Sequence, residues 1–298
     1  MALSNNPARV IVSTAVAGTQ WKIAGDMHDL SSRGWIMGVL NITPDSFSDG
    51  GRFFDHHSAL AHAADMVEQG ADIIDVGGES TRPGAGTIDA EEEKRRVIPV
   101  IKKLAAEYKA LLISVDTSKA EVAKAALDAG AKIVNDVTGG GDPRMFSLIS
   151  ERGAGLIIMH MQGTPQTMQR APHYHDVVGE VADFFRQRCA RAIACGIDPM
   201  TLAFDPGIGF GKTPAHNLSL LKHLPRLRTG NQPLVVGVSR KSFLKKIARS
   251  DGVSTGRDAM TAAFSSMLRL NGADILRVHE VKSNLEALRA ADALRNAS

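Results

Sequence analysis

TLAFDPGIGFGKTP, residues 201–214, is the stretch that decides the fold. Its first four residues are apolar enough for a buried strand, which ends at Asp205. The glycines that follow predict a loop whose backbone can approach a flat ligand closely. Thr213 and Pro214 are residue types typical of a helix N-cap and a first helical position. A strand, a glycine loop and a helix together make one unit of an α/β architecture.

The same unit recurs along the chain. Short apolar runs that lack alternation, as is typical of parallel strands covered on both faces, occur at residues 36–40, 72–76, 111–115, 132–134, 155–159, 201–204, 234–238 and 274–278. Helical patterns lie between them, and Ser118 and Asp142 are predicted as N-caps. Eight strands alternating with helices predict a single (β/α)8 TIM barrel over residues 36–298. Residues 1–35 are expected to form an N-terminal extension with a β-hairpin, located between residues 9 and 30.

Composition limits the class of partner. The 298 residues include 35 basic and 32 acidic side chains, and this balance gives no case for binding nucleic acid. No stretch approaches the roughly 20 apolar residues needed to span a bilayer, so no membrane partner is expected. Cys189 and Cys195 are six positions apart in a helical pattern, about 9 Å along the axis and on different faces. They are therefore expected to be free thiols, which favours a cytoplasmic location.

Polar or charged residues follow every predicted strand. In TIM barrels the active site lies at the carboxyl ends of the strands, so a site is expected among Asn41, Asp75, Glu79, Asp116, Asn135, Asp136, His160, Asp205, Arg240, Lys241, Arg277 and His279.

The acidic and amide residues of this set predict a heterocycle site. Asp116, Asn135 and Asp205 offer acceptors for the N–H edge of a planar, guanidine-like ring. The alternative for Asp116 and Asn135 is that they only cap helices. From spacing alone this alternative stays open.

The cationic residues predict an anion site. Arg277 and His279 are two apart on a strand and so face the same way, which suits a phosphate or pyrophosphate. A surface ion pair is the alternative. Lys241 opens a helix after the seventh strand and could hold a substrate carboxylate, or could be one of several solvated lysines. The loops at residues 41–51 and 77–86 are longer than connectors need to be, and their composition suits lids.

These two loops belong to a set of motifs that closely resembles the dihydropteroate synthase family of pterin-binding enzymes. The other motifs are SVDTSK (114–119), VNDV (134–137), MHMQGTP (159–165), FDPGIGFGK (204–212), GVSRKS (237–242) and RVH (277–279). The resemblance runs in order from about residue 36 to residue 280. It implies that the chain joins 6-hydroxymethyl-7,8-dihydropterin pyrophosphate to p-aminobenzoate, giving 7,8-dihydropteroate and pyrophosphate. It also implies Mg²⁺ as cofactor and a homodimer.

The resemblance assigns site residues by position. It places the pterin pocket at Asp116, Asn135, Asp205 and Lys241, with Met159 and the Gly209 backbone as walls. It places the pyrophosphate site at Asn41, Arg277 and His279, with Mg²⁺ near Asn41. The residues that surround p-aminobenzoate and, competitively, sulfonamides are Phe47, Thr81, Arg82, Pro83, Phe210, Lys241 and Ser242.

The chemistry implied here needs no general base, because an aromatic amine is already a neutral nucleophile. Loss of pyrophosphate is the harder step, and Mg²⁺, Arg277 and His279 would neutralise its charge. Asp116 and Asp205 would stabilise a pterin cation, which predicts an SN1-like displacement. The alternatives are a pterin-binding methyltransferase module, which has no use for an anion clamp, and a non-catalytic pterin binder, which has no use for lids.

Overall fold

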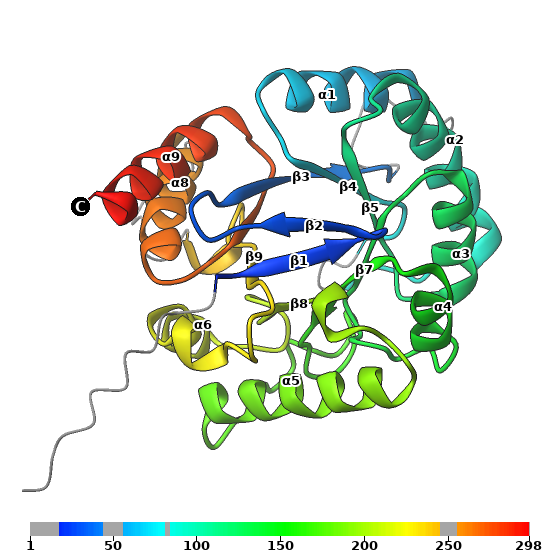
Figure 1. Ribbon diagram of the computed structural model, residues 1–298. Coiled ribbons are helices and arrows are strands. Elements are labelled where there is room, and N and C mark those ends of the chain that lie inside the picture. The colour runs from blue at the N-terminus through cyan, green and yellow to red at the C-terminus, as the bar shows by residue number, and fades with distance from the viewer. Residues whose placement is uncertain (1–17, 44–55, 81–83, 245–254, 298) are drawn as a thin grey trace, which may run out of the picture.

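The computed structural model describes residues 18–43, 56–80, 84–244 and 255–297, and these residues form a barrel of parallel strands inside a ring of helices (Figure 1). After a two-stranded hairpin of β1 (Gln20–Ile23) and β2 (Asp26–Asp29), the barrel strands are β3 (Trp35–Asn41), β4 (Ile73–Gly77), β5 (Leu112–Asp116), β6 (Ile133–Asp136), β7 (Gly155–Met159), β8 (Leu202–Asp205), β9 (Val235–Val236) and β10 (Ile275–Val278). The α-helices are α1 (His56–Glu68), α2 (Ala90–Glu107), α3 (Ala120–Ala129), α4 (Met145–Arg152), α5 (Val177–Ala194), α6 (Pro214–Lys222), α8 (Thr255–Leu270) and α9 (Lys282–Asn296), with short 3₁₀ turns at η1 (Pro199–Thr201) and η2 (Leu224–Leu227).

The sheet closes on itself. Its strand order is β8-β7-β6-β5-β4-β3-β10-β9, and every pairing is parallel. A parallel bridge between Phe204 and Leu234, with the Phe204 amide donating to Pro233 O at 2.9 Å, joins the two ends. The predicted (β/α)8 barrel is confirmed. The seventh strand is shorter than predicted, because ladder pairing in β9 is limited to Val235 and Val236.

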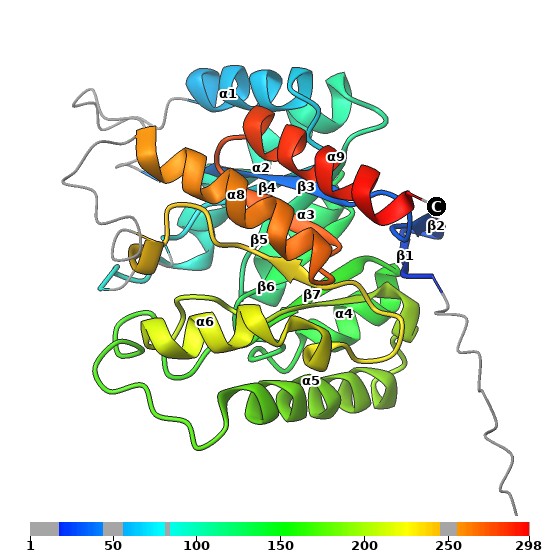
Figure 2. The ribbon, with the colours of Figure 1, turned by 90° about the vertical axis from the view of Figure 1, so that its left-hand side faces the viewer.

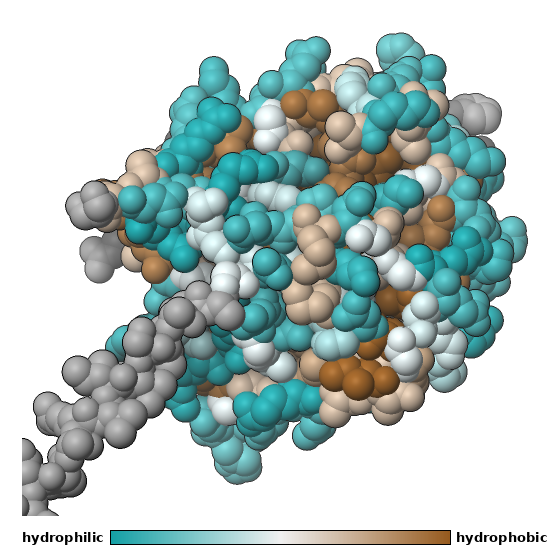
Figure 3. Space-filling model, viewed as in Figure 1, coloured by the Kyte–Doolittle hydropathy of each residue, from teal (hydrophilic) through white to brown (hydrophobic). Residues whose placement is uncertain are grey.

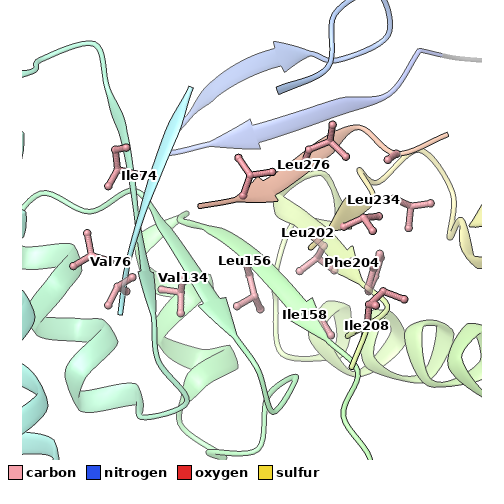
Figure 4. Packing of buried hydrophobic residues seen from close by; sticks show 14 of the residues in the cluster. Ile74, Val76, Val134, Leu156, Ile158, Leu202, Phe204, Ile208, Leu234 and Leu276 are labelled. Atoms are coloured by element: carbon pink, nitrogen blue, oxygen red, sulfur yellow. The ribbon is translucent and has the colours of Figure 1, made fainter. Parts of the chain in front are cut away.

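Alternate residues of each strand serve two different cores. Outward-facing side chains pack under the helices, and Figure 4 shows them on several strands, for example Val76 on β4, Val134 on β6 and Leu276 on β10. Inward-facing side chains such as Ile73 and Ile157 fill the barrel. Both faces are buried, which explains why the strands read as unbroken apolar runs.

The hairpin of β1 and β2 closes the amino-terminal end of the barrel. Trp21, Ile23 and Leu30 are buried against the inward-facing core, and Trp21 Nε1 donates to Thr201 O at 2.8 Å. The hairpin crosses the front of the barrel in Figure 1, and most of this face is hydrophilic (Figure 3). A hairpin within residues 9–30 is thus confirmed; residues 9–17 of that range lie outside the described residues. Because this end is plugged, a substrate must approach the barrel from the other end.

Helix starts agree with the sequence only in part. Thr213 caps α6 in a full capping box with His216, as its residue type predicts. The predicted N-cap at Ser118 is wrong: α3 begins at Ala120 after Lys119, which makes no side-chain cap. Asp142 is not the N-cap of α4 either, but its carboxylate accepts from the amide of Ala120 at 3.0 Å and so caps α3 instead.

Two further sequence predictions concern the cysteines and membranes. Cys189 is buried, Cys195 is exposed, and both are free thiols, as their spacing predicts. Among the described residues, no helix combines the length and apolarity required to cross a bilayer.

Candidate active site

Strand register brings the predicted acids and amides to one level at the carboxyl end of the barrel. Asn41 pairs with Gly77, Gly77 with Asp116, and Asp116 with Asn135, on four neighbouring strands. Gly77 leaves space between its neighbours: a Cβ built on it would lie 3.5 Å from both Asn41 Oδ1 and Asp116 Cβ. Asp75 faces inward two residues before Gly77, and so lies one layer deeper.

A buried ionic network forms the floor of this site. Asp75 is fully buried, and its Oδ2 accepts from Asn135 Nδ2 at 3.0 Å and from Arg277 Nε at 2.7 Å. The Arg277 guanidinium also donates from Nη2 to Asp116 Oδ2 at 2.7 Å. The network therefore links β4, β5, β6 and β10 across the barrel. Asp75 Oδ1 is buried with no hydrogen-bond partner among the described residues.

In this network two carboxylates, Asp75 and Asp116, contact a single cation, Arg277, and this arrangement affects the pKa values of Asp116 and Arg277. The pKa of Asp116 is raised to about 7, chiefly by burial; Arg277 opposes the rise, and the nearby carboxylates of Asp75, Glu93 and Asp136 add to it. Burial would lower the pKa of Arg277, but Asp75 and Asp116 outweigh it, and the pKa lies above its usual range. Arg277 therefore remains a cation, and Asp116 changes charge close to neutral pH.

The loop between β8 and α6 supplies the opposite wall. Asp205 is buried, its Oδ1 accepts from the Gly207 amide at 2.7 Å, and burial raises the pKa of its carboxyl. The Lys241 ammonium lies 4.1 Å from the centroid of the Phe210 ring, in cation–π contact. Burial and the nearby Arg277 lower the pKa of Lys241 to about 8, against the attraction of Asp205 and Asp116. Lys241 therefore interacts electrostatically with both Asp116 and Asp205.

An apolar cluster lies next to the charged groups. Met159 at the end of β7 and Phe210 in the loop after β8 pack with Val137 and Met168, and all four are buried. Met161 packs against them from the side. Charged acceptors on one side and a small apolar wall on another suit a flat heterocycle.

Some of the other predicted site residues are described by the structure, and the rest lie outside the described residues. His279 contacts Ser239, with its Nδ1 3.0 Å from Ser239 Oγ, and Ser242 is exposed at the start of the segment after β9. Gly209 lies in the glycine loop, and its amide donates to Asn217 Oδ1 at 2.8 Å. Phe47 and residues 81–83 (Thr81, Arg82 and Pro83) lie outside the described residues.

Asp75 was in the set predicted from the strand ends but without a particular role, and Met168 was not predicted. Asp75 precedes the end of β4 by two positions, so it faces the same way as Gly77. Met168 comes from the long segment between β7 and α5, and no periodicity points to it. Lys212 was also missed, although it is almost fully buried at the end of the glycine loop.

Comparison with known proteins identifies the family of the chain. A sequence model of the family described as pterin binding enzyme matches residues 37–279. The dihydropteroate synthase of Mycobacterium leprae is 45% identical over 264 residues, which cover 87% of this chain and 92% of the relative. The chain belongs to the dihydropteroate synthase family of pterin-binding enzymes.

Solved structures of dihydropteroate synthases agree with the fold. A Xanthomonas albilineans dihydropteroate synthase with 4-aminobenzoic acid superposes with a TM-score of 0.86 at 42% identity, over 94% of this chain and 100% of that one. A second structure of this enzyme, in complex with 7,8-dihydropteroate, gives a TM-score of 0.81 at 36% identity, with the same coverage. The predicted family and activity are confirmed: the chain is a transferase of the dihydropteroate synthase type, which transfers a pterin group to p-aminobenzoate.

Proposed function

We propose that the pocket formed by the floor network and the glycine loop condenses 6-hydroxymethyl-7,8-dihydropterin pyrophosphate with p-aminobenzoate by an SN1-like displacement. The observation that carries this proposal is the convergence of Asp75, Asp116, Asn135 and Arg277 on one buried network at the open end of the barrel. The family supplies the identity of the substrates, and the geometry supports the assignment of roles below.

The pterin ring occupies the acidic side of the pocket. Asp116 and Asn135 lie side by side on β5 and β6, and Asp205 comes from β8. Their oxygen atoms accept from the N–H groups of the ring, and a carboxylate does so more strongly than a neutral acceptor. Met159 and Phe210 provide apolar contact for the rest of the ring.

The pyrophosphate lies toward the cationic side. Asp75 and Asp116 engage Nε and Nη2 of Arg277, so Nη1 is the guanidinium nitrogen directed to a phosphate oxygen. His279 comes directly after the end of β10, two positions after Arg277. Both side chains neutralise charge that develops on the departing group.

Asn41 is the residue that would hold Mg²⁺. Its amide oxygen is a hard donor, and it flanks the same space as Asp116. Among the described residues, no group of three His, Cys, Asp or Glu side chains could bind a metal by itself. This donor set fits an ion that takes its remaining ligands from substrate phosphates and water, as Mg²⁺ usually does. Bound there, Mg²⁺ supplies further charge neutralisation for the leaving diphosphate.

p-Aminobenzoate enters above the pterin. Phe210 and Lys241 border this region, and Lys241 offers a cation to the substrate carboxylate. Ser242 and residues 47 and 81–83 complete the aminobenzoate site by their match to the family motifs. Sulfonamides would compete for the same place.

The order of bond changes follows from these charges. The bond between the methylene carbon and the bridging oxygen breaks first, and its electron pair leaves with pyrophosphate. The ionised carboxylates of Asp116 and Asp205 stabilise the resulting pterin cation. The amine nitrogen of p-aminobenzoate then bonds to the methylene carbon and releases its proton to water.

We further propose a cytoplasmic homodimer. Met267 and Leu270 of α8 and Leu294 of α9 are each at least half exposed. These two helices pack side by side (Figure 2), so the three side chains are candidates for the contact with a second copy.

A pyrophosphate-release assay with and without p-aminobenzoate tests the proposed reaction. We expect release to depend on p-aminobenzoate and to match the 7,8-dihydropteroate formed. A pterin-binding methyltransferase module or a non-catalytic pterin binder would release no pyrophosphate under either condition.

A further inference from the structure

Lys212 is a buried cation for which the proposed reaction has no use. Its side chain folds back beneath the glycine loop, and the residue is 2% exposed. The ammonium donates to three backbone carbonyls, Gly207 O at 3.0 Å, Phe210 O at 3.0 Å and His160 O at 3.2 Å. His160 Nδ1 lies 2.9 Å from the same nitrogen, and as the ammonium can only donate, Nδ1 accepts.

The contacts of Lys212 join the loop after β8 to the end of β7, and the proposed pterin pocket depends on the relative position of these two segments. Two of its carbonyl partners belong to the loop after β8, and the third belongs to the end of β7. The loop already lies tightly against this end: a Cβ on Gly207 would come 1.9 Å from His160 O, and one on Gly211 would come 2.4 Å from Gln162 O. Both glycines have φ of +63°, so the close approach and the backbone conformation each require glycine.

The loop in turn holds Lys241. A Cβ on Gly209 would lie 3.3 Å from Lys241 Cδ, so the stem of Lys241 packs on the Gly209 backbone. The ammonium of Lys241 then lies over the Phe210 ring. Asp205 is fixed at the other end of the loop through the Gly207 amide. A shift of this loop would therefore displace an acid and a cation of the pterin pocket together.

We propose that Lys212 is a positioning residue for pterin binding, which ties the loop between Asp205 and Lys212 to the end of β7 and thereby sets the positions of Asp205, Phe210 and Lys241. This inference rests on the proposed pterin pocket. Burial suits the role, because one ammonium donates to three backbone carbonyls and to His160 Nδ1, four acceptors that share its three N–H groups. Burial also lowers the pKa of Lys212 to about 7, while the neighbouring Asp205 carboxylate opposes this effect.

Substitution at Lys212 tests this role. Lys212→Met keeps most of the side-chain length and removes every donor, and Lys212→Gln keeps one donor group. Lys222→Met makes the same change at an exposed lysine in the last turn of α6 and is the matched control. For each variant, calorimetry gives the Kd for 6-hydroxymethylpterin, which lacks the diphosphate. Steady-state assays give kcat and both KM values, and circular dichroism gives Tm.

We expect Lys212→Met to raise the Kd for the pterin and the KM for pterin pyrophosphate at least tenfold, with a smaller change in kcat. Lys212→Gln should give an intermediate effect, and Lys222→Met should stay within twofold of wild type.

If Lys212→Met does not fold, the Gln variant is used for the comparison. Unchanged pterin affinity in a folded variant, or a loss confined to kcat, would overturn the proposal. So would failure of both variants to fold, since Lys212 would then support the whole barrel. A wild-type chain that bound the pterin and released no pyrophosphate would refute the reaction but not this role.

Discussion

Asp75 Oδ2 lies 2.7 Å from Arg277 Nε, and this contact joins two strands that are 202 positions apart in the sequence. Asp75 is fully buried and also accepts from Asn135. One carboxylate therefore orients both an amide of the pterin pocket and the cation proposed to meet the diphosphate. We expect Asp75 to orient these two neighbours rather than to contact substrate.

Replacing Asp75 with Asn tests this orienting role. The change removes a charge-assisted hydrogen bond, so the free energy of unfolding should fall by about 1.5–3 kcal/mol. Small displacement of Asn135 and Arg277 should lower kcat/KM for pterin pyrophosphate by about 100-fold. Urea denaturation and steady-state kinetics measure the two effects. Asp198→Asn, in the exposed pair with Lys22, is the control and should change stability by less than about 1 kcal/mol.

Lys241→Ala should weaken the use of both substrates, because Lys241 shares the electrostatic site of Asp205 and Asp116 and borders the aminobenzoate region. We expect kcat/KM to fall by about 100-fold or more for each substrate. Steady-state kinetics with each substrate varied in turn provide the measurement, and Lys222→Ala provides the control. Near-normal kinetics for Lys241→Ala would refute the role.

The dependence of kcat/KM on pH should be bell-shaped. Asp116, with its pKa raised to about 7 by burial, carries the charge that stabilises the pterin cation only when ionised, so activity should rise as pH increases through about 7. Lys241, with its pKa lowered to about 8 by burial, loses its charge above that pH, so activity should then fall. Asp116→Asn should abolish the acidic limb and Lys241→Met the alkaline limb. Identical profiles for wild type and variants would show that the substrate, which is the same in each assay, determines the titration.

Arg269 should contribute to stability and not to catalysis. It is fully buried, and its guanidinium donates to Asp292 Oδ1 at 2.6 Å, Ala273 O at 3.0 Å and Leu30 O at 3.1 Å. These contacts join α8 and α9 to the segment after the hairpin. Arg269→Met leaves the Asp292 carboxylate without its partner and should cost about 3–5 kcal/mol in urea denaturation. Its KM values should not change, and Arg289→Met, on the exposed face of α9, should alter neither property.

The barrel could be predicted from sequence because each barrel strand is buried on both faces and is followed closely by polar residues. Asp116, Asn135 and Asp205 could be placed in one site on this basis, since parallel strands bring their carboxyl ends to one edge. The motif match then added the identity of the ligand. Register was not needed for these predictions, because the carboxyl ends of parallel strands all lie at the same end of the barrel.

Contacts that depend on side-chain direction could not be predicted. The sequence predicted a phosphate site at Arg277 but not its contacts with Asp75 and Asp116, which form because two buried acids need a cation. Asp142 was expected to cap its own helix and caps α3 instead, since the two helices start side by side. Lys212 comes directly after the glycine loop, and the sequence does not show that this loop folds over its side chain.

Positional isotope exchange tests most directly the claim that the acids of the pocket let pyrophosphate leave before the amine attacks. Pterin pyrophosphate carrying ¹⁸O in the bridge between its methylene carbon and the α-phosphorus would be incubated with enzyme, Mg²⁺ and p-toluate, which lacks the amine. Reversible ionisation predicts that ¹⁸O moves from the bridge to non-bridging positions of the α-phosphate, seen by ³¹P NMR. Retention of all label in the bridge, under conditions where p-aminobenzoate is turned over normally, would contradict the dissociative order.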